Sequence, residues 1–549
     1  MTSIHRTRGT LLRRGSILGL LVLLWAFAAS DRTPASLSNA AFAAQSDQRG
    51  KKDDKPDHDL SALKIFNRVV ILIKDNYVDP KRVEPRKMLV NALDQVEMRV
   101  AEIMVEGDEK SPKIKLTVGK TSKEFDVTGV DSLWRMSFAL KEVFDFINKN
   151  LTERDETREI EYAAVNGMLK TLDPHSVLLS PDYFKEMKLQ TKGEFGGLGF
   201  VIQMKEGNLT VVKVLKGTPA YKAGIKNKDQ ILKINAESTV NMDLNEAVAR
   251  LRGKPDSEVT ISLNRQGFPK PKDLTLKRAI INVESVESKL LSNNVGYIKL
   301  KGFQGNTARD MHAQIKALRE EAGKNAAEGS KLKGLVLDLR NNPGGLLDQA
   351  IQISDAFIDS GTLVTTVGYS DKLREVKKAH PDETERELPI VVIVNSGSAS
   401  ASEIVSGALK NHDRAVVIGR QTFGKGSVQV LYDFPDDSAL KLTIAQYLTP
   451  GDISIQEVGI TPDIQLIPSR VAKDRIDVFA PKKIMGEADL DKHLGNPNGD
   501  KVASKRDEVV QREKPLEELR YLRELTAAEK REEKAAGDDL AALEELEEA

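Results

Sequence analysis

Alternating serines occupy the stretch NSGSASASEI at residues 395–404, directly after the apolar run LPIVVIV. Ser400 is a candidate nucleophile, because a serine between a buried strand and a helix lies where α/β sheets place their ligand sites. The sequence from Ser400 to Glu403 also fits a helix capping box, and the local pattern alone favours that role. The two roles are compatible, since a residue that begins a helix can also react.

A nucleophilic serine needs a base, and no histidine is an obvious candidate. His412 lies at the far end of the helix predicted after Ser400, some ~15 Å away, and His175 lies in a predicted turn. Lys425, between two glycines in RQTFGKGSVQV, is the alternative. It can act as a base only if burial lowers its pKa from about 10.4 by roughly 3 units. Gln429 would share one face of an extended strand with it and could orient the amine. A glycine-flanked surface lysine is the structural alternative.

Backbone amides could stabilise the oxyanion that forms when a serine attacks a carbonyl group. Ala401, at the predicted helix start, carries one such amide. The turn NNPGG at residues 341–345 follows the neighbouring apolar strand. Its glycines let backbone amides point at a ligand, so Gly344 or Gly345 is the second candidate donor. As an isolated motif, NNPGG indicates an ordinary turn.

The composition excludes several classes of site. The chain has 549 residues, enough for two to four domains, and 82 basic residues balance 82 acidic ones. This balance gives no reason to expect a nucleic-acid partner. No cysteine is present, so disulfides, thiolate metal sites and cysteine nucleophiles are excluded, and the 7 histidines form no HExxH pattern. We therefore expect no metal and no organic cofactor.

The candidate loops require elements that bring them together. Apolar strands alternate with helices across residues 284–468, which predicts an α/β core with parallel strands and a terminal hairpin. Residues 60–190 are mostly helical by their apolar spacing, and residues 191–283 indicate a compact inserted module of short strands with helices. Residues 469–549 form a charged extension that we expect to be helical or disordered. Together these segments predict a multidomain α/β protein.

The first residues are typical of an export signal. A basic stretch ending at Arg14 precedes the apolar run SILGLLVLLWAFAA and two A-x-A sites. We expect a cleaved signal peptide at residues 1–44, a polar linker at residues 45–59 and a periplasmic or secreted protein. An uncleaved signal would instead anchor the chain in the inner membrane.

Six motifs, all in the same order, resemble those of the carboxy-terminal processing peptidases of serine peptidase family S41. The resemblance runs from about residue 162 to residue 468. The motifs are GMLKTLDPHSVLLSP, GEFGGLGFVI, AGIKNKDQILKIN, LDLRNNPGGLL, NSGSASASEI and GRQTFGKGSVQ. Each is weak alone, whereas all six in register are highly specific.

The resemblance implies a serine–lysine dyad. Ser400 would be the nucleophile, Lys425 the general base and Gln429 the residue that supports the base. It also implies that the oxyanion hole combines the Ala401 amide with one of the two glycine amides of the NNPGG turn.

The inserted module resembles a PDZ domain. In that family the stretch GLGF, here Gly197, Leu198, Gly199 and Phe200, is the carboxylate-binding loop. Successive amides of this loop would hold a terminal carboxylate while the bound chain adds as a strand beside FVIQM. A pocket beside DLNEAVARL would take an apolar last side chain. A glycine-rich strand entry is the structural alternative for GLGF.

The residues and the resemblance together predict an exported serine endopeptidase whose protein or peptide substrates are recognised by their free C-termini. The alternative is a non-catalytic PDZ adaptor or scaffold on a peptidase-like fold. A penicillin-binding or β-lactamase-like enzyme is a weaker rival, because Ser61 and Lys64 match S-x-x-K without partner motifs. An adaptor protein and a homo-oligomer are both compatible with the sequence, which identifies neither.

Overall fold

The computed structural model describes residues 59–152, 157–205, 207–240, 242–265, 267–325, 331–368, 374–382, 384–469, 485–496, 515 and 517–522. The signal peptide predicted at residues 1–44 and nearly all of the linker predicted at residues 45–59 lie outside this part of the chain. Among the described residues, every helix is too short or too polar to cross a membrane.

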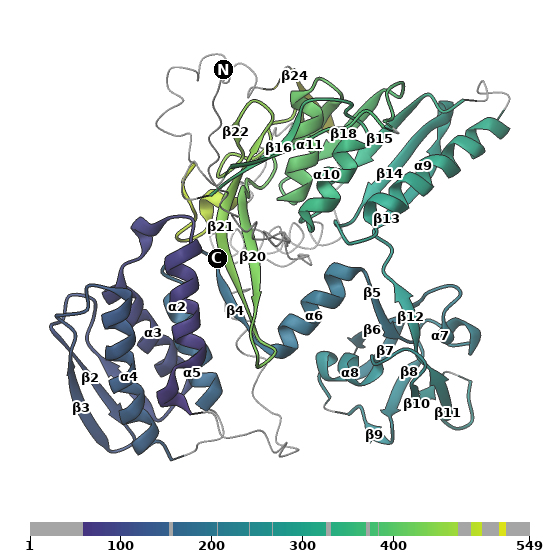
Figure 1. The fold of residues 1–549 in the computed structure, drawn as a ribbon. Helices are drawn as coiled ribbons and strands as arrows, with labels where there is room; N and C mark the ends of the chain where they lie inside the picture. The colour runs from purple at the N-terminus through teal and green to yellow at the C-terminus, as the bar shows by residue number, and fades with distance from the viewer. Residues whose placement is uncertain are drawn as a thin grey trace, which may run out of the picture.

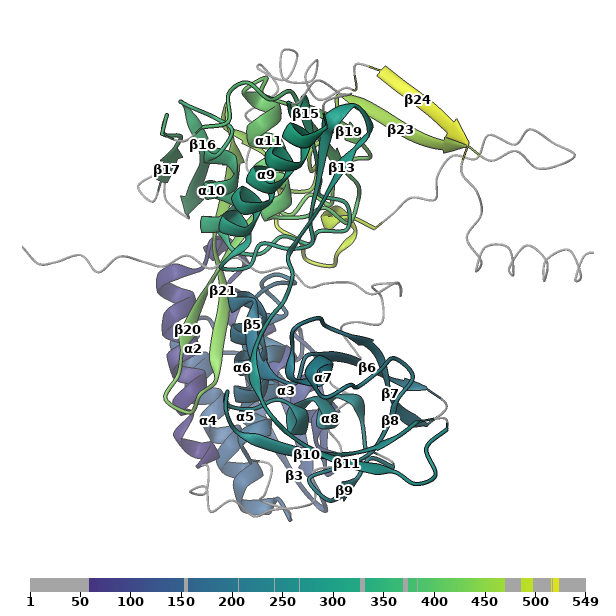
Figure 2. The same cartoon turned by 90° about the vertical axis from the view of Figure 1, so that its right-hand side faces the viewer.

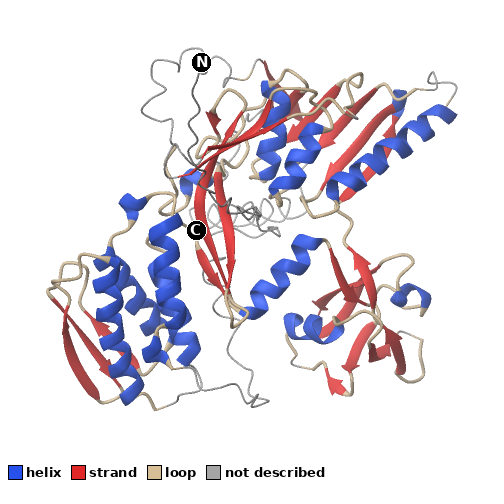
Figure 3. Ribbon diagram, in the orientation of Figure 1, coloured by secondary structure: helices blue, strands red, loops and turns tan. Residues whose placement is uncertain are grey.

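Figure 1 shows three bodies, and Figure 3 shows their helices and strands. A helical N-terminal region lies at the lower left, a β-rich module lies at the lower right, and an α/β core lies above them. This arrangement confirms the predicted multidomain α/β fold with an inserted β-rich module.

The N-terminal region packs helices against a three-stranded antiparallel sheet, β1-β2-β3. Its elements are η2 (Leu60–Ala62), α2 (Lys64–Asn76), η3 (Pro80–Arg82), α3 (Pro85–Arg99), β1 (Ile103–Glu106), β2 (Lys113–Val118), β3 (Thr121–Asp126), α4 (Leu133–Asn150) and α5 (Thr157–Leu169). The helices bury their apolar stripes in one hydrophobic cluster that includes Phe66, Leu89 and Phe144. Helices α3 and α5 lie so close that a Cβ on Gly167 would meet the Asn91 carbonyl oxygen at 2.2 Å.

The β-rich module follows α6 (Pro181–Lys192). Its elements are β5 (Glu194–Gly197), β6 (Phe200–Lys205), β7 (Asn208–Val214), α7 (Pro219–Lys222), β8 (Gln230–Ile234), β9 (Glu237–Ser238), α8 (Leu244–Leu251), β10 (Glu258–Asn264), β11 (Lys272–Lys277) and β12 (Ala279–Asn282). Six strands form one sheet, in which β11-β10-β8-β7-β6 follow in this order and β9 pairs with β8. β6 is an edge strand of this sheet. β5 and β12 pair antiparallel where the chain enters and leaves the module (Figure 1).

The core contains a seven-stranded sheet in the order β13-β14-β15-β18-β19-β23-β24, in which every pair except β13 with β14 is parallel. Its elements are β13 (Val286–Leu291), η4 (Ser292–Asn294), β14 (Val295–Leu300), α9 (Thr307–Lys324), β15 (Gly334–Asp338), α10 (Leu347–Asp355), β18 (Ile390–Val394), α11 (Ala401–Asn411), β19 (Val416–Gly419), β23 (Ile464–Ser469) and β24 (Glu517–Leu522). Because neighbouring parallel strands end at the same edge, the loops after β15 and β18 lie side by side.

A second sheet carries the predicted hairpin. Its strands are β4 (Val177–Leu179), β16 (Thr362–Gly368), β17 (Arg374–Lys378), β20 (Ser427–Asp433), β21 (Ala439–Thr449) and β22 (Ile453–Ser454). β20 and β21 run from the core down to the N-terminal helices (Figures 1 and 2). There Leu440 and Leu442 of β21 join the hydrophobic cluster of the N-terminal region. The hairpin therefore ties that region to the core.

Two described stretches of the C-terminal extension, residues 485–496 and 517–522, differ from the charged helix or disorder expected across residues 469–549. Its described residues hold a single turn, η6 (Glu487–Asp489), and the strand β24, which pairs parallel with β23. Contacts with distant parts of the chain explain these structures. The backbone donors and acceptors at the edge of β23 pair with β24. Glu487 is 0% exposed, because it packs against the core. The charge content of a segment does not reveal such partners.

Candidate active site

Ser400 lies at the junction between the loop after β18 and the start of α11. Its φ of 56° and ψ of −113° are sparsely populated for a residue with a side chain, which costs about 1–3 kcal/mol. One of the two hydrogen bonds of the predicted capping box is present, because the Glu403 carboxylate accepts from the Ser400 amide at 2.7 Å. The Ser400 hydroxyl is buried and has no hydrogen-bond partner among the described residues. The helix is thus capped without engaging the hydroxyl.

The candidate oxyanion donors lie near Ser400. The Ala401 amide begins α11 and donates to no acceptor in the described part of the chain. A Cβ on Gly344 would lie 2.9 Å from the Ser400 Cβ and 3.0 Å from the Ala401 nitrogen, so Gly344 adjoins both residues. The Gly344 amide donates to Asn342 Oδ1 at 3.0 Å, whereas no described residue accepts from the Gly345 amide. The Gly345 amide has a free hydrogen among the described residues, whereas the Gly344 amide would have to leave Asn342 before it could donate to an oxyanion. Both glycines stay predicted donors.

Lys425 lies in the loop between β19 and β20 and is 5% exposed. This burial excludes the alternative of a surface lysine. Burial lowers the pKa of Lys425, while the carboxylates of Glu487, Asp173 and Glu403 act in the opposite direction. A lysine base requires a pKa lowered in this way, because only the neutral amine can accept a proton.

Glu403 joins the loop of Ser400 to the loop of Lys425. Its Oε2 accepts from the Ser400 amide at 2.7 Å and from the Lys425 amide at 3.0 Å. Its Oε1 accepts from the Thr422 hydroxyl at 2.6 Å and from the Gly424 amide at 2.7 Å. Burial raises the pKa of the Glu403 carboxyl to about 7, although these four donors favour the charged form. One buried side chain thus sets the spacing of both loops.

Gln429 lies on β20 and is buried. Its amide nitrogen donates to Ser427 Oγ at 2.9 Å and to Thr443 Oγ1 at 3.4 Å. The pairing of β20 with β21 shifts register between Val428 and Gln429, and Lys425 precedes the strand. The extra residue of this bulge lies on β21, where Ile444 has no partner on β20, so the shared face of Lys425 and Gln429 stays a prediction.

The loop DPHS, residues 173–176, reaches the base of the same hairpin. Asp173 accepts from the Ser176 hydroxyl at 2.6 Å and from the Thr443 hydroxyl at 2.9 Å. Thr443 in turn accepts from Gln429. A chain of buried hydrogen bonds therefore connects this loop to the residue predicted to support the base.

His175 and Glu487 are site residues that sequence reasoning missed. His175 Nε2 lies 2.9 Å from Glu487 Oε1. The His175 side chain is 14% exposed, and the Glu487 side chain is 0% exposed. Burial lowers the pKa of His175, and the charge of Lys425 lowers it further. The motif containing His175 is part of the family resemblance, but its local composition indicates only a turn. Nothing in the sequence around Glu487 indicates burial.

No hydrogen bond joins the candidate nucleophile to the candidate base in this structure. Ser400 Oγ has no partner among the described residues, and so the Lys425 amine does not bond to it. Catalytic hydrogen bonds are often long before the substrate binds. Glu403 brings the two loops together, but the contact between Ser400 Oγ and Lys425 Nζ that proton transfer requires is absent from this structure.

The GLGF residues lead into the edge strand of the β-rich module. Gly197 ends β5, and Phe200 begins β6. Gly199 has a φ of 84°, and a Cβ there would lie 2.3 Å from the Thr218 Cβ, so only glycine fits. The amides of Leu198 and Gly199 donate to no acceptor among the described residues. Helix α8 packs beside the edge strand β6, as a peptide-binding groove requires.

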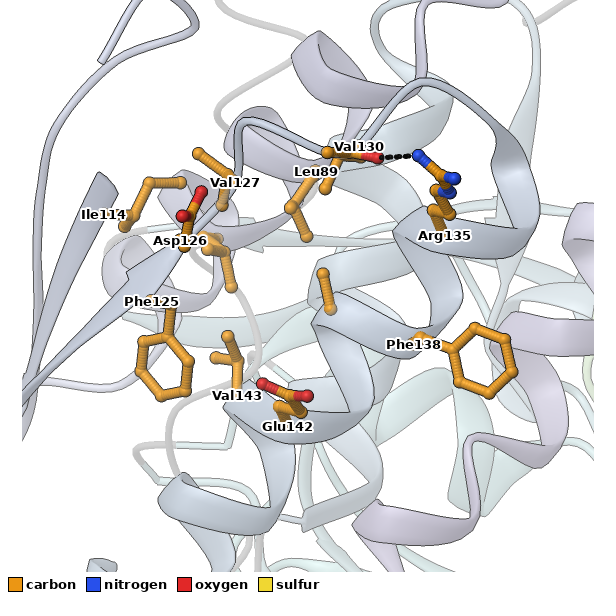
Figure 4. Close-up of a pocket in the computed structure, with 13 residues that line it drawn as sticks. Leu89, Ile114, Phe125, Asp126, Val127, Val130, Arg135, Phe138, Glu142 and Val143 are labelled. Atoms are coloured by element: carbon orange, nitrogen blue, oxygen red, sulfur yellow. Dashed lines mark hydrogen bonds between the residues drawn. The ribbon is translucent and has the colours of Figure 1, made fainter. Parts of the chain in front are cut away.

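A cavity of about 310 Å³ lies elsewhere, in the N-terminal region between β3 and α4 (Figure 4). Phe125 and Phe138 line it, and Arg135 at its rim donates to the Gly129 carbonyl oxygen at 3.2 Å. No residue predicted for catalysis or peptide binding lines this cavity. The described residues also hold no cluster of acidic and histidine side chains that could bind a metal ion.

Two family models match the chain. The model of peptidase family S41 matches residues 294–466, and the model of the PDZ domain matches residues 186–264. The first match covers most of the core, including the loops of Ser400 and Lys425. The second covers the C-terminal half of α6 and most of the β-rich module.

Curated relatives give the same assignment. The chain is 42% identical over 366 residues to the carboxy-terminal-processing protease of Bartonella bacilliformis, which covers 66% of this chain and 81% of that protein. The chain belongs to peptidase family S41. This S41 peptidase is also 38% identical over 329 residues to the carboxy-terminal processing protease CtpA of Bacillus subtilis, which covers 59% of this chain and 68% of that protein. It is therefore a serine peptidase of the carboxy-terminal processing type, and its β-rich module is a PDZ domain.

A solved structure is also similar to this S41 peptidase. The photosystem II D1 C-terminal processing protease is 24% identical to it, with a TM-score of 0.39 over 74% of this chain and 93% of that chain.

Residues 485–496, which include Glu487, lie beyond both family matches.

Proposed function

We propose that this S41 peptidase is an exported endopeptidase that uses Ser400 as its nucleophile and Lys425 as its general base. The observation that carries the proposal is the Glu403 carboxylate, which accepts from the backbone amides of both residues while fully buried. A buried carboxylate that joins two loops is expected to fix their relative position, because breaking either bond would leave buried polar groups without partners. The side chains of Ser400 and Lys425 are both buried on these loops.

The proposed reaction begins when Ser400 Oγ attacks the carbonyl carbon of the scissile peptide bond and its proton passes to Lys425 Nζ. The Ala401 amide and the amide of Gly344 or Gly345 stabilise the oxyanion of the tetrahedral intermediate. The Lys425 ammonium then gives its proton to the leaving amine, which breaks the peptide bond and leaves an ester on Ser400. Neutral Lys425 next removes a proton from water, whose oxygen attacks the ester carbonyl. The Lys425 ammonium then returns this proton to Ser400 Oγ as the bond between the acyl group and Ser400 breaks, which releases the acid and regenerates the enzyme.

Gln429 supports the base in this proposal. Its Oε1 has no partner among the described residues and is buried, so it can accept a hydrogen bond. An amide oxygen can orient the Lys425 amine without adding a charge that would favour the ammonium form. The amine must approach Ser400 Oγ before attack, because the two groups are not hydrogen-bonded in the resting arrangement.

The substrates are proteins or peptides with free C-termini. The unbonded amides of Leu198 and Gly199, with that of Phe200, are suited to hold a terminal carboxylate. The substrate then pairs with the edge strand β6, and an apolar last side chain lies between β6 and α8. Engagement of the PDZ domain is proposed to gate the catalytic centre.

Export rests on the sequence of residues 1–44, which carry a basic region, an apolar run and A-x-A sites. We place the enzyme in the periplasm or outside the cell, or at the inner membrane if the signal is retained. Absence of cysteine suits such an oxidising compartment.

The test is cleavage of a polypeptide that ends in a free apolar residue, with products identified by mass spectrometry. The wild type should cleave it, and amidation of the C-terminus should slow cleavage because the PDZ loop loses the carboxylate. Ser400→Ala and Lys425→Ala should abolish turnover and leave peptide binding unchanged. Binding without any cleavage by the wild type would instead identify a non-catalytic PDZ adaptor.

A further inference from the structure

A short segment of the charged C-terminal extension lies on the catalytic core. We call this segment, residues 485–496, the strap. Glu487 within it is 0% exposed. Its backbone is held by Arg82 of the N-terminal region, whose guanidinium donates to the carbonyl oxygens of Lys492 and His493, each at 2.7 Å. The strap is therefore a packed element, although it lies outside both family matches.

The strap brackets the loop that carries Lys425. On one side of the lysine, the Glu487 amide donates to the Phe423 carbonyl oxygen at 2.9 Å. On the other side, the Gly426 amide donates to Gln456 Oε1 at 2.9 Å, and the Gln456 amide nitrogen donates to Glu487 Oε1 at 3.1 Å. Both flanks of Lys425 are thus linked to Glu487.

The Glu487 carboxylate also contacts the DPHS loop. Its two oxygens lie 2.9 and 3.0 Å from His175 Nε2. Among the carboxylates whose charges act on Lys425, that of Glu487 has the largest influence. A buried carboxylate with two side-chain partners is costly to displace, because its loss leaves His175 and Gln456 without this acceptor.

We propose that the strap is a positioning segment of the active site, in which the Glu487 carboxylate holds the Lys425 loop through Gln456 and the Glu487 backbone amide adds a bond to Phe423. The inference rests on the proposed Ser400 and Lys425 chemistry and extends the site beyond the matched family region. Without the strap, the loop of Lys425 would keep its bonds to Glu403 but lose the restraints on its two flanks. A displacement of the base by about 1 Å is enough to reduce turnover about 100-fold.

The experiment compares Glu487→Ala, Glu487→Gln and Asp491→Ala in the full chain, using steady-state cleavage of a polypeptide with a free apolar C-terminus. Glu487→Ala should lower kcat at least about tenfold and leave KM within about twofold, because the PDZ domain is untouched. Glu487→Gln keeps an acceptor for Gln456 and should recover kcat to within about threefold of the wild type. Asp491→Ala, which changes an exposed acid of the same strap, should match the wild type.

Equal kcat values for Glu487→Ala and Asp491→Ala would overturn the proposal, as would a loss in Glu487→Ala that Glu487→Gln does not recover. If thermal unfolding shows that Glu487→Ala does not fold, Glu487→Asp replaces it, since its shorter side chain withdraws the carboxylate from His175 and Gln456. The same fall in kcat is expected there, and wild-type turnover would contradict the inference.

Failure of the underlying chemistry would be distinguishable. In that case the wild type would not cleave, or Lys425→Ala would remain active. The strap inference fails on its own only where the wild type cleaves, Ser400→Ala and Lys425→Ala are inactive, and Glu487→Ala is not impaired.

Discussion

At the scale of single residues, Glu403 faces two opposing demands. Four donors surround its carboxylate and favour the charged form, while complete burial disfavours it. The outcome is a pKa raised to about 7. Below that pH the carboxyl becomes protonated, and one oxygen turns from an acceptor into a donor. The protonated side chain then resembles a glutamine in shape and hydrogen bonding.

Glu403→Gln should therefore reproduce the protonated state at every pH. Two buried donors lose their acceptor, at a cost of about 1–3 kcal/mol each, and the loops of Ser400 and Lys425 lose part of their connection. We expect kcat at pH 8 to fall at least about tenfold and the ratio of wild-type to variant kcat to approach unity near pH 5. Steady-state kinetics from pH 5 to 9 measure this ratio. A constant ratio would contradict the role of the Glu403 charge.

The ionisation of Lys425 gives a second prediction. Burial lowers its pKa, and only the neutral amine accepts the Ser400 proton, so kcat/KM should rise as pH rises through the pKa of the free enzyme. The midpoint should lie below the ordinary lysine value of about 10.4. The groups whose charges act on the pKa of this amine are Glu487, Asp173 and Glu403. The charge of Lys425 in turn lowers the pKa of His175 and of Lys441. The Glu403→Gln variant has no ionisable group at position 403, so its pH profile reports the ionisation of Lys425 alone. A midpoint at the ordinary lysine value would contradict the prediction.

At the scale of elements, the parallel sheet explains why distant motifs meet. β15 and β18 are adjacent and parallel, so the NNPGG turn and the loop of Ser400 leave the sheet at one edge. This much follows from the sequence, because each strand is a short apolar run that ends at a glycine-rich or serine-rich turn. The close approach of Gly344 to Ser400 follows from the same geometry.

Gly344→Ala should impair catalysis more than stability. The added methyl group would lie 2.8 Å from the Ala399 carbonyl oxygen and 2.9 Å from the Ser400 Cβ, and the φ of 100° is strained for alanine. We expect the displaced Ser400 to lower kcat by about 100-fold. Gly119→Ala is the matched control, because its φ of 57° is also positive but no atom lies within 4 Å of the added carbon. Similar kcat values for the two variants would contradict the predicted contact.

Other parts of the site could not be predicted from local sequence. The hydrogen bond from Gln429 to Thr443 depends on how β20 pairs with β21, which the sequence of β20 does not reveal. DPHS has the composition of a turn, and its role depends on Thr443, far away in the sequence. The strap is short and lies in a charged extension, so neither periodicity nor hydrophobicity distinguishes Glu487 from the acids around it. In each case the deciding partner is distant in the chain.

At the scale of the whole molecule, the PDZ domain and the residues proposed for cleavage lie on different bodies. The PDZ domain joins the remainder through α6 and through the paired strands β5 and β12 (Figure 1). The hairpin β20–β21 and the strap both connect the catalytic core to the N-terminal region. In the absence of a bound peptide, variants of the PDZ loop should therefore leave the reactivity of Ser400 unchanged, although they weaken peptide binding.

Gly199→Ala tests that separation. A methyl group there would lie 2.3 Å from the Thr218 Cβ, so the carboxylate-binding loop must move. Loss of two or more amide bonds to a carboxylate should weaken binding of a C-terminal peptide at least about tenfold. The rate at which a fluorophosphonate labels Ser400 should stay unchanged. Gly217→Ala, with a φ of 78° and no atom within 4 Å of the added carbon, is the matched control for both assays. Unaltered peptide binding by Gly199→Ala would contradict the assignment of the loop.

The central claim is that a buried, neutral Lys425 activates Ser400, and covalent labelling by a fluorophosphonate tests it most directly. The wild type, Ser400→Ala and Lys425→Ala proteins would each be labelled at pH 8, digested and mapped by mass spectrometry. We expect the label on Ser400 in the wild type, none in Ser400→Ala, and a rate at least about 100-fold lower in Lys425→Ala. Labelling of Lys425→Ala at the wild-type rate, or a label on another residue of the wild type, would contradict the account.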